Sequence, residues 1–142
     1  MKNLFLDTNI VIDVLANRQP FSIIGARLFD FAEKGKIKLF ISALSYSNIY
    51  YILKKSCSHK ETISLLRDLE ALTSTIDVTG RIISNALNSE FKDFEDAIQN
   101  FTADSSKKMD AIVTRDVKDY KTSDLPVFTP NEVLKMLEND AA

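Results

Sequence analysis

The chain has 142 residues, of which 45% are hydrophobic, and it carries a formal net charge of −2 with only three glycines and three prolines. This length and apolar content predict a single domain, residues 1–142, with a sizeable core, and the few glycines and prolines argue against a long flexible linker. The slightly acidic balance argues against a strongly basic surface that gathers nucleic acid non-specifically, although it leaves room for a nucleic-acid substrate held through metal ions.

The N-terminal segment and the single cysteine indicate the cellular compartment of the protein. The chain begins directly with a strand-like segment, without the basic region and long apolar core of a signal peptide. No run approaches the roughly 18 apolar residues of a membrane span, and Cys57 has no partner for an intrachain disulfide. The sequence therefore predicts a cytoplasmic protein that does not enter a membrane.

Five apolar runs are short enough to be strands. In chain order they are Asn3–Leu6, Lys38–Ser42, Thr75–Val78, Ala111–Thr114 and Val127–Thr129. Several of these runs are unbroken rather than alternating, which is typical of strands that are buried on both faces of a parallel sheet.

Segments with the apolar period of a helix lie between these strands. They comprise a helix starting near Asn9, then Phe21–Lys34, Ser45–Lys55 and Lys60–Leu72, and a helix from Phe94 to about Ser105 that Asp93 caps. A last helix starts at Pro130, with Thr129 as its cap and Glu132 at its third position. The sequence predicts an α/β fold, a three-layer α/β/α sandwich with a central, mainly parallel sheet of about five strands.

Carboxylates stand near the ends of the predicted strands. Asp7 follows the first strand, Asp116 follows the fourth, and Asp96 lies in the first turn of a helix between strands. Because open parallel sheets bind ligands at the carboxyl ends of their strands, these side chains are expected to converge. Clustered carboxylates need a compensating charge, which Mg²⁺ or Mn²⁺ provides. Such an ion activates water, so phosphodiester hydrolysis needs no nucleophilic side chain.

Each carboxylate also has a purely structural interpretation. Asp7 would cap the first helix, Asp96 would interact with the dipole of its helix, and Asp116 would cap a turn. Asp119 would be a surface charge, and Asp13 is expected to face solvent on the first helix. Taken singly, these residues decide little.

Three motifs follow one another along the chain. They are Leu6-Asp7-Thr8-Asn9, Phe91-Lys92-Asp93-Phe94-Glu95-Asp96-Ala97 and Val113-Thr114-Arg115-Asp116-Val117-Lys118-Asp119-Tyr120. Together they resemble the PIN domain family, and within it the bacterial VapC-like, PilT N-terminal-type ribonucleases. The resemblance spans nearly the whole chain, since Leu125-Pro126-Val127-Phe128-Thr129-Pro130 is similar to the last strand and helix start of that family.

The resemblance implies a Mg²⁺- or Mn²⁺-dependent endoribonuclease acting on single-stranded or structured RNA. Such proteins are often the toxin of a toxin–antitoxin pair and often homodimers. The catalytic metal ligands would be Asp7, Asp96 and Asp116. Thr8 and Asn9 would orient Asp7 or the substrate, and Asp119 would serve if Asp116 lay away from the metals.

One position departs from the family pattern. The segment Ser42-Ala43-Leu44-Ser45-Tyr46-Ser47-Asn48 has Asn48 where the family usually has a glutamate. Asparagine offers a carbonyl oxygen but no charge, so metal affinity should fall. Glu95 is near Asp96 in sequence, but its helical direction differs by about 100°. The alternative function is therefore a catalytically weak or inactive PIN scaffold that binds RNA or protein.

Other candidates are weaker. Arg115, beside Asp116, is the best basic candidate for a contact to RNA phosphate, and Tyr46 or Tyr51 would stack on a base or pack in a dimer interface. Cys57 and His59 are close in sequence, but zinc needs more such ligands than the chain has. Two other α/β classes fit poorly: a haloacid dehalogenase-type phosphatase needs an aspartate where Asn9 stands, and a dinucleotide-binding fold needs a glycine-rich first turn.

Overall fold

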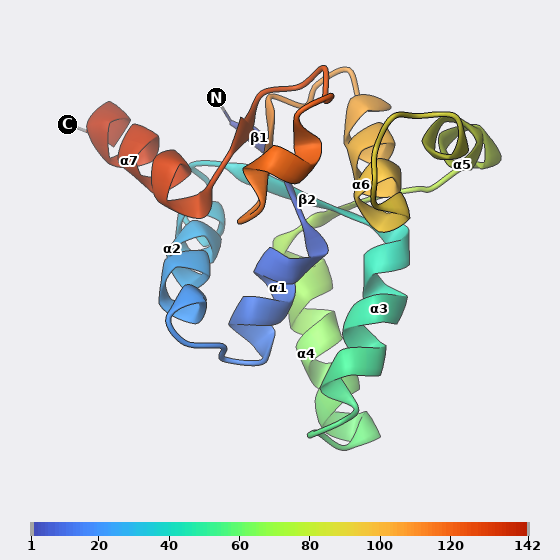
Figure 1. Cartoon of the computed structure of the whole chain (residues 1–142). Coiled ribbons are helices and arrows are strands. Elements are labelled where there is room, and N and C mark those ends of the chain that lie inside the picture. The colour runs from blue at the N-terminus through green and yellow to red at the C-terminus, as the bar shows by residue number, and fades with distance from the viewer. Residues whose placement is uncertain (1, 142) are drawn as a thin grey trace.

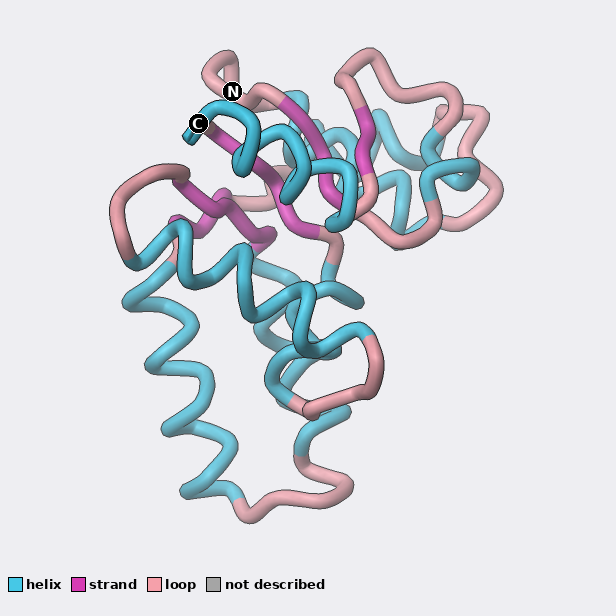
Figure 2. The backbone as a smooth tube through the Cα atoms, turned by 90° about the vertical axis from the view of Figure 1, so that its left-hand side faces the viewer, coloured by secondary structure: helices cyan, strands magenta, loops and turns pink. Residues whose placement is uncertain are grey.

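The computed structural model describes residues 2–141 and centres on one parallel sheet. Its strands are β1 (Asn3–Leu6), β2 (Lys38–Ser42), β3 (Ser74–Ile76), β4 (Ala111–Val113) and β5 (Val127–Phe128), in the spatial order β3-β2-β1-β4-β5. Figure 2 shows these strands side by side as magenta segments. Because β1 pairs with both β2 and β4, the segments that follow β1 and β4 leave the same edge of the sheet as neighbours. The predicted parallel sheet is confirmed.

Helices cover both faces of the sheet. They are α1 (Thr8–Leu15), α2 (Phe21–Glu33), α3 (Ala43–Leu53), α4 (His59–Leu72), α5 (Gly80–Leu87), α6 (Phe94–Asp104), the 3-10 helix η1 (Val117–Tyr120) and α7 (Pro130–Ala141). One face packs against α1 to α4 and α7, and the other packs against α6, on which α5 is stacked (Figure 1). This arrangement confirms the three-layer sandwich. Within residues 2–141, none of the helices has the length and apolar character needed to span a membrane.

The central strand shows why the apolar runs are unbroken. Leu4 and Leu6 point into the core cluster beneath α1, α2 and α7, whereas Phe5 points into the opposite cluster with Ile112 and Ala103. These three side chains are completely buried. A strand buried on both faces needs apolar residues at successive positions, which gives a run rather than an alternation.

Local capping determines where the helices begin. Both predicted caps are present: Asp93 Oδ1 accepts from the Asp96 N–H at 3.0 Å, and Thr129 Oγ1 accepts from the Glu132 N–H at 3.2 Å. In contrast, α3 starts two residues before the predicted Ser45, because Ser42 at the end of β2 accepts from the Leu44 N–H and caps the helix.

The third strand is also shorter than predicted. It ends at Ile76 rather than Val78, and Thr79 then caps α5 by accepting from the Ile82 N–H at 3.3 Å. The apolar pattern of the sequence gave no bounds for this helix.

Candidate functional site

Asp7 stands where β1 passes into α1, and its carboxylate is buried, with 3% exposure. Oδ1 accepts from the Asn9 N–H at 3.0 Å and from Gln99 Nε2 at 3.3 Å. Oδ2 accepts from Thr114 Oγ1 at 2.8 Å and from the Tyr120 hydroxyl at 3.4 Å. A carboxylate offers about four acceptor positions. The side chain is therefore a helix cap, as its structural interpretation predicts, and also the centre of a polar cluster.

Asp96 lies on the first turn of α6 and is joined to Asp7 by one hydroxyl group. The Tyr120 hydroxyl is 3.4 Å from Asp96 Oδ1, the same separation that it has from Asp7. Burial and, after it, the nearby carboxylates of Asp7, Asp93 and Asp119 together raise the pKa of Asp96 to about 7. The Asp7–Asp96 pair is thus a place where negative charge is costly and a cation is favoured.

Tyr120 and Gln99 hold this pair of carboxylates. Burial, together with the two carboxylates, raises the pKa of the Tyr120 phenol, so the hydroxyl remains a proton donor. Gln99 donates from Nε2 to this hydroxyl at 3.3 Å, while its Oε1 accepts from the Thr8 N–H at 2.7 Å. Thr8 therefore reaches Asp7 through Gln99, and its own hydroxyl lies 2.7 Å from that of Ser45.

Gln99 and Tyr120 are missing from the residues that the sequence suggested. Gln99 follows Asp96 by three positions on α6 and so lies on the same helix face. Tyr120 directly follows Asp119 and is fully buried, at 1% exposure. The signal in the sequence that could have identified Gln99 was its position one helical turn after the candidate carboxylate Asp96.

An open cavity of about 340 Å³ lies over the Asp7–Asp96 pair, and Asn9, Asn48 and Glu95 line it as well. Asn48 Nδ2 is 3.5 Å from Glu95 Oε1, at the outer limit of a hydrogen bond. The position of the expected family glutamate is thus beside the candidate site and is occupied by a neutral amide.

The other two candidate aspartates lie apart from this cavity. Asp116 lines a separate cavity of about 260 Å³, and its backbone N–H donates to Thr114 Oγ1 at 3.1 Å. Asp119 lines a third cavity of about 470 Å³ together with Asp93 and Asp96. Asp119 therefore lies near Asp96, whereas Asp116 lines a different cavity from the Asp7–Asp96 pair.

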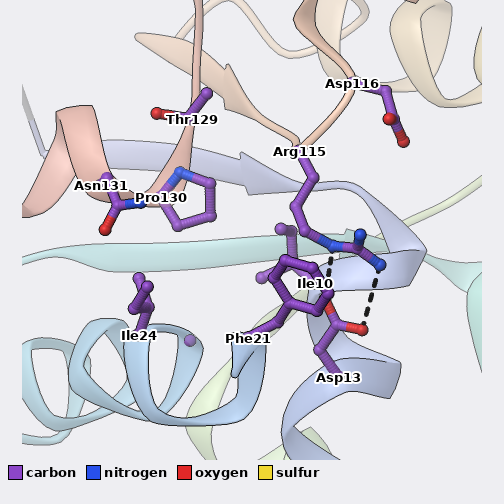
Figure 3. A pocket seen from close by; sticks show the side chains of 10 residues that line it. Ile10, Asp13, Phe21, Ile24, Arg115, Asp116, Thr129, Pro130 and Asn131 are labelled. Atoms are coloured by element: carbon purple, nitrogen blue, oxygen red, sulfur yellow. Dashed lines mark hydrogen bonds and ion pairs between the residues drawn. The ribbon is translucent and has the colours of Figure 1, made fainter. Parts of the chain in front are cut away.

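The expectation that Asp13 faces solvent is wrong. Asp13 is 1% exposed, and it accepts from Arg115 Nε at 2.7 Å and Nη2 at 3.2 Å, as the dashed lines in Figure 3 show. The face of α1 that carries Asp13 is covered by the segment after β4, which supplies the arginine. Because of these two bonds, the Asp13 carboxylate already compensates the charge of Arg115. Arg115 also lies over the ring of Phe21, at 3.9 Å from its centroid.

The donor set fits Mg²⁺ or Mn²⁺. Within residues 2–141, no three Asp, Glu, His or Cys side chains gather closely enough to form a complete metal cage. Mg²⁺, however, usually takes one or two protein carboxylates and fills its remaining positions with water and substrate phosphate. The Asp7–Asp96 pair offers that number of carboxylates beside an open cavity.

Of the weaker candidates, His59 and Tyr46 have partners away from the candidate site, whereas Tyr51 lies beside it. The His59 ring nitrogen Nδ1 lies 2.8 Å from the Tyr50 hydroxyl, and the Tyr46 hydroxyl accepts from Thr75 Oγ1 at 3.3 Å. Tyr51 is 72% exposed and lines the cavity over Asp7.

A family model described as PIN domain matches residues 3–118 of the chain. A search among curated proteins gives no match. Several solved structures share the fold. A DNA-bound VapBC from Salmonella typhimurium is 14% identical, with a TM-score of 0.70 over 92% of this chain and 99% of that one. A toxin–antitoxin complex from Klebsiella pneumoniae is 25% identical, with a TM-score of 0.64 over 89% and 97%.

A third similar structure is that of VapC20 from Mycobacterium tuberculosis, described as a sarcin–ricin loop cleaving toxin. It is 15% identical, with a TM-score of 0.59 over 77% of this chain and 86% of that one.

Proposed function

Because the chain belongs to the PIN domain family, we propose that it is a Mg²⁺- or Mn²⁺-dependent endoribonuclease that hydrolyses phosphodiester bonds in RNA. One observation carries the proposal: the carboxylates of Asp7 and Asp96, which come from different elements, share the Tyr120 hydroxyl beneath an open cavity at the carboxyl edge of the sheet. Carboxylates placed in this way suit a hard cation and a phosphate ligand.

In this proposal, each residue near the pair has a defined role. Asp7 and Asp96 would hold the cation, Asp96 in its deprotonated form. Gln99 and Thr114 fix the orientation of the Asp7 carboxylate by hydrogen bonds to its two oxygens. When bound, the metal ion supplies an activated water and neutralises charge on the phosphate. Asp119 is favoured over Asp116 as the third carboxylate, because Asp119 lines the same cavity as Asp96.

The partner of this proposed nuclease is an antitoxin protein. Support comes from the similar structures, which include a toxin–antitoxin complex and VapBC assemblies. Coexpression with the product of a short neighbouring gene, followed by copurification, tests this pairing. Failure of every such gene product to copurify would favour a nuclease that acts alone.

We also propose a homodimer formed through the apolar patch at the starts of α3 and α6. Leu44 and Phe94 are 44% and 47% exposed there, and both line a cavity of about 270 Å³ beside Asn48 and Glu95. Sedimentation of the intact protein should give a dimer, and Leu44→Lys with Phe94→Lys should give a folded monomer. A wild-type monomer at micromolar concentration would contradict this proposal.

The nuclease proposal is tested by metal binding and RNA cleavage in parallel. The intact protein should bind Mn²⁺ in calorimetry and cleave an end-labelled single-stranded RNA, and a chelator should stop the cleavage. Asp7→Asn should abolish both signals, whereas Asp30→Asn, an exposed aspartate on α2, should change neither. Absence of metal-dependent cleavage by the intact protein, whether or not Mn²⁺ binds, would refute the proposal.

A second candidate function is a PIN scaffold that binds RNA or a protein with little or no catalysis. The neutral Asn48 favours it, since the position beside Asp7 and Asp96 lacks the charge that would strengthen metal binding. Fluorescence polarisation with labelled RNA in chelator distinguishes the two functions. Tight RNA binding without cleavage after Mn²⁺ is added would support the scaffold.

A further inference from the structure

A second cavity lies on the other side of α1 from the acidic one and has a different chemistry. Phe21 and Arg115 form one of its walls, Pro130 and Asn131 form the opposite wall, and Ile24 lies below (Figure 3). The volume is about 260 Å³. Drug-sized ligands usually occupy cavities of about 300–1,000 Å³, so this one suits a single planar ring system that belongs to a larger ligand.

The wall formed by Phe21 and Arg115 is a fixed platform. The guanidinium lies 3.9 Å over the aromatic ring, and two hydrogen bonds to the buried carboxylate of Asp13 hold it in place. Close packing of α1 on α2 supports Phe21: a Cβ at Gly25 would come within 2.5 Å of Val14 Cγ2. Rigid aromatic and guanidinium surfaces of this kind stack with nucleobases.

The charges around the cavity favour a neutral ligand. The Arg115 charge is compensated by Asp13, and Asp116 at the rim adds a negative charge. Among the residues that line the cavity, a phosphate group would therefore find no unpaired cation. A base is neutral, and its stacking does not depend on a free charge.

One wall offers a group that recognises base edges. Asn131 is exposed at the start of α7, and its side chain makes no hydrogen bond within residues 2–141. The helix start itself is satisfied, since Thr129 and Glu132 cap one another. A side-chain amide presents a donor and an acceptor together, the combination that pairs with the edge of a base.

The cavity also adjoins the candidate active site, because consecutive residues of α1 line the two. Asn9 lines the acidic cavity and Ile10 lines this one, so the two flank the first turn of α1. Thr114 bonds to both Asp7 and the backbone of Asp116, which lies at the rim. A nucleic-acid strand lying over the start of α1 would therefore reach both cavities at once.

We propose that this cavity, which we call the base pocket, holds one nucleobase of the RNA substrate, next to the phosphate that lies over Asp7 and Asp96. The inference rests on the proposed ribonuclease function for the identity of the ligand. The base stacks on the Phe21–Arg115 platform, and Asn131 bonds to its edge. Arg115 then contacts the base, in place of the phosphate contact that its position in the sequence suggested.

The test uses fluorescence, because the chain contains no tryptophan. Phe21→Trp places a single reporter in the base pocket, and Ile23→Trp is its matched control on α2, at a position that is 61% exposed and does not line the cavity. Each variant is titrated with the four nucleoside monophosphates and with ribose 5-phosphate in chelator, so that no cleavage occurs. If a variant is poorly folded, nucleotide binding is followed instead in the unsubstituted protein, by the change in the NMR signals of the Ile24 methyl groups.

We expect saturable quenching of Phe21→Trp by at least one nucleotide, none by ribose 5-phosphate, and none in Ile23→Trp. Asn131→Ala in the reporter background should weaken that binding by about two- to tenfold, as the loss of one hydrogen bond predicts. Equal quenching by ribose 5-phosphate would overturn base recognition. Quenching by a partner protein but by no nucleotide would make the cavity a protein-docking site and overturn the proposal.

The outcome separates this inference from the proposed activity. If the protein cleaves RNA but neither Phe21→Trp nor the Ile24 signals respond to nucleotides, the base pocket is refuted and the nuclease stands. If the reporter responds and no metal-dependent cleavage occurs, the base pocket stands and the nuclease proposal fails.

Discussion

Gln99 donates a hydrogen bond from Nε2 to Oδ1 of Asp7 across 3.3 Å, and this bond joins α6 to the end of β1. It is one of four hydrogen bonds that the Asp7 carboxylate accepts. The two longest, from Gln99 and Tyr120, are also the weakest by geometry. A cation that binds Asp7 must therefore compete with these two donors first.

Replacing Tyr120 by phenylalanine should tighten metal binding. The change removes the hydroxyl that lies between Asp7 and Asp96 but keeps the ring, which packs edge-on against Phe91 at a centroid distance of 5.9 Å. A net hydrogen bond is worth about 0.5–1.5 kcal/mol, so the Mn²⁺ dissociation constant in calorimetry should fall by about two- to tenfold. Without metal, the unfolding free energy should fall by a similar amount.

Tyr50→Phe is the matched control, because within residues 2–141 the Tyr50 hydroxyl bonds to His59 and to no residue of the carboxylate cluster. It should leave Mn²⁺ affinity unchanged. Weaker binding in Tyr120→Phe would mean that the hydroxyl holds the two carboxylates in their metal-binding geometry instead of competing with the cation.

The sequence predicted those features of the fold that depend on local signals. The bounds of β1 and β2 match the apolar runs Asn3–Leu6 and Lys38–Ser42, and the caps Asp93 and Thr129 lie where their side chains indicated. Strand burial and capping involve residues that are close in the chain. They can therefore be inferred before any tertiary contact is known.

The partners of the candidate site could not be predicted in the same way. Asp13 was expected in solvent because its partner Arg115 is 102 positions away in the chain. Tyr120 joins Asp7 and Asp96 only because η1 folds back over α6. Such contacts depend on tertiary placement, for which apolar periodicity gives no signal.

Metal binding and stability should depend on pH through Asp96. Its pKa is raised from 3.8 to about 7, chiefly by burial and then by Asp7, so the folded protein holds a proton that the unfolded chain releases at lower pH. This contribution to the unfolding free energy is complete below about pH 4 and is lost as the pH rises through about 7. The melting temperature of the metal-free protein should therefore fall between about pH 4 and pH 7.

Asp96→Asn should show a smaller fall over that range, since the amide does not titrate. In the wild-type protein, Mn²⁺ affinity should weaken below about pH 7, by up to about tenfold per pH unit, because the cation must displace the proton. If the wild type and Asp96→Asn have the same melting profile, Asp96 does not titrate in this range.

Asn48→Glu should raise Mn²⁺ affinity, and the double variant Asn48→Glu/Glu95→Gln should raise it further. The single change places a second carboxylate beside Glu95, whose Oε1 is 3.5 Å from Asn48 Nδ2, and this like-charge contact opposes part of the gain. The cleavage rate of single-stranded RNA should follow the same order. Asn85→Glu, at an exposed position on α5, is the control for added negative charge. Equal Mn²⁺ affinity in all these proteins would mean that position 48 does not reach the metal.

Arg115→Ala should destabilise the protein strongly, because it leaves the carboxylate of Asp13 buried with only Arg18 nearby, at 3.8 Å. Breaking a buried ion pair costs about 3–5 kcal/mol, and the lower end applies because the Arg115 side chain is 29% exposed. Urea unfolding should show this loss, and Asp13→Asn in the Arg115→Ala background should recover part of it by removing the unpaired charge. Arg67→Ala, at an exposed position on α4, should be nearly neutral. If Arg115→Ala were as stable as Arg67→Ala, the ion pair would contribute nothing to the fold, and the platform of the base pocket would not depend on it.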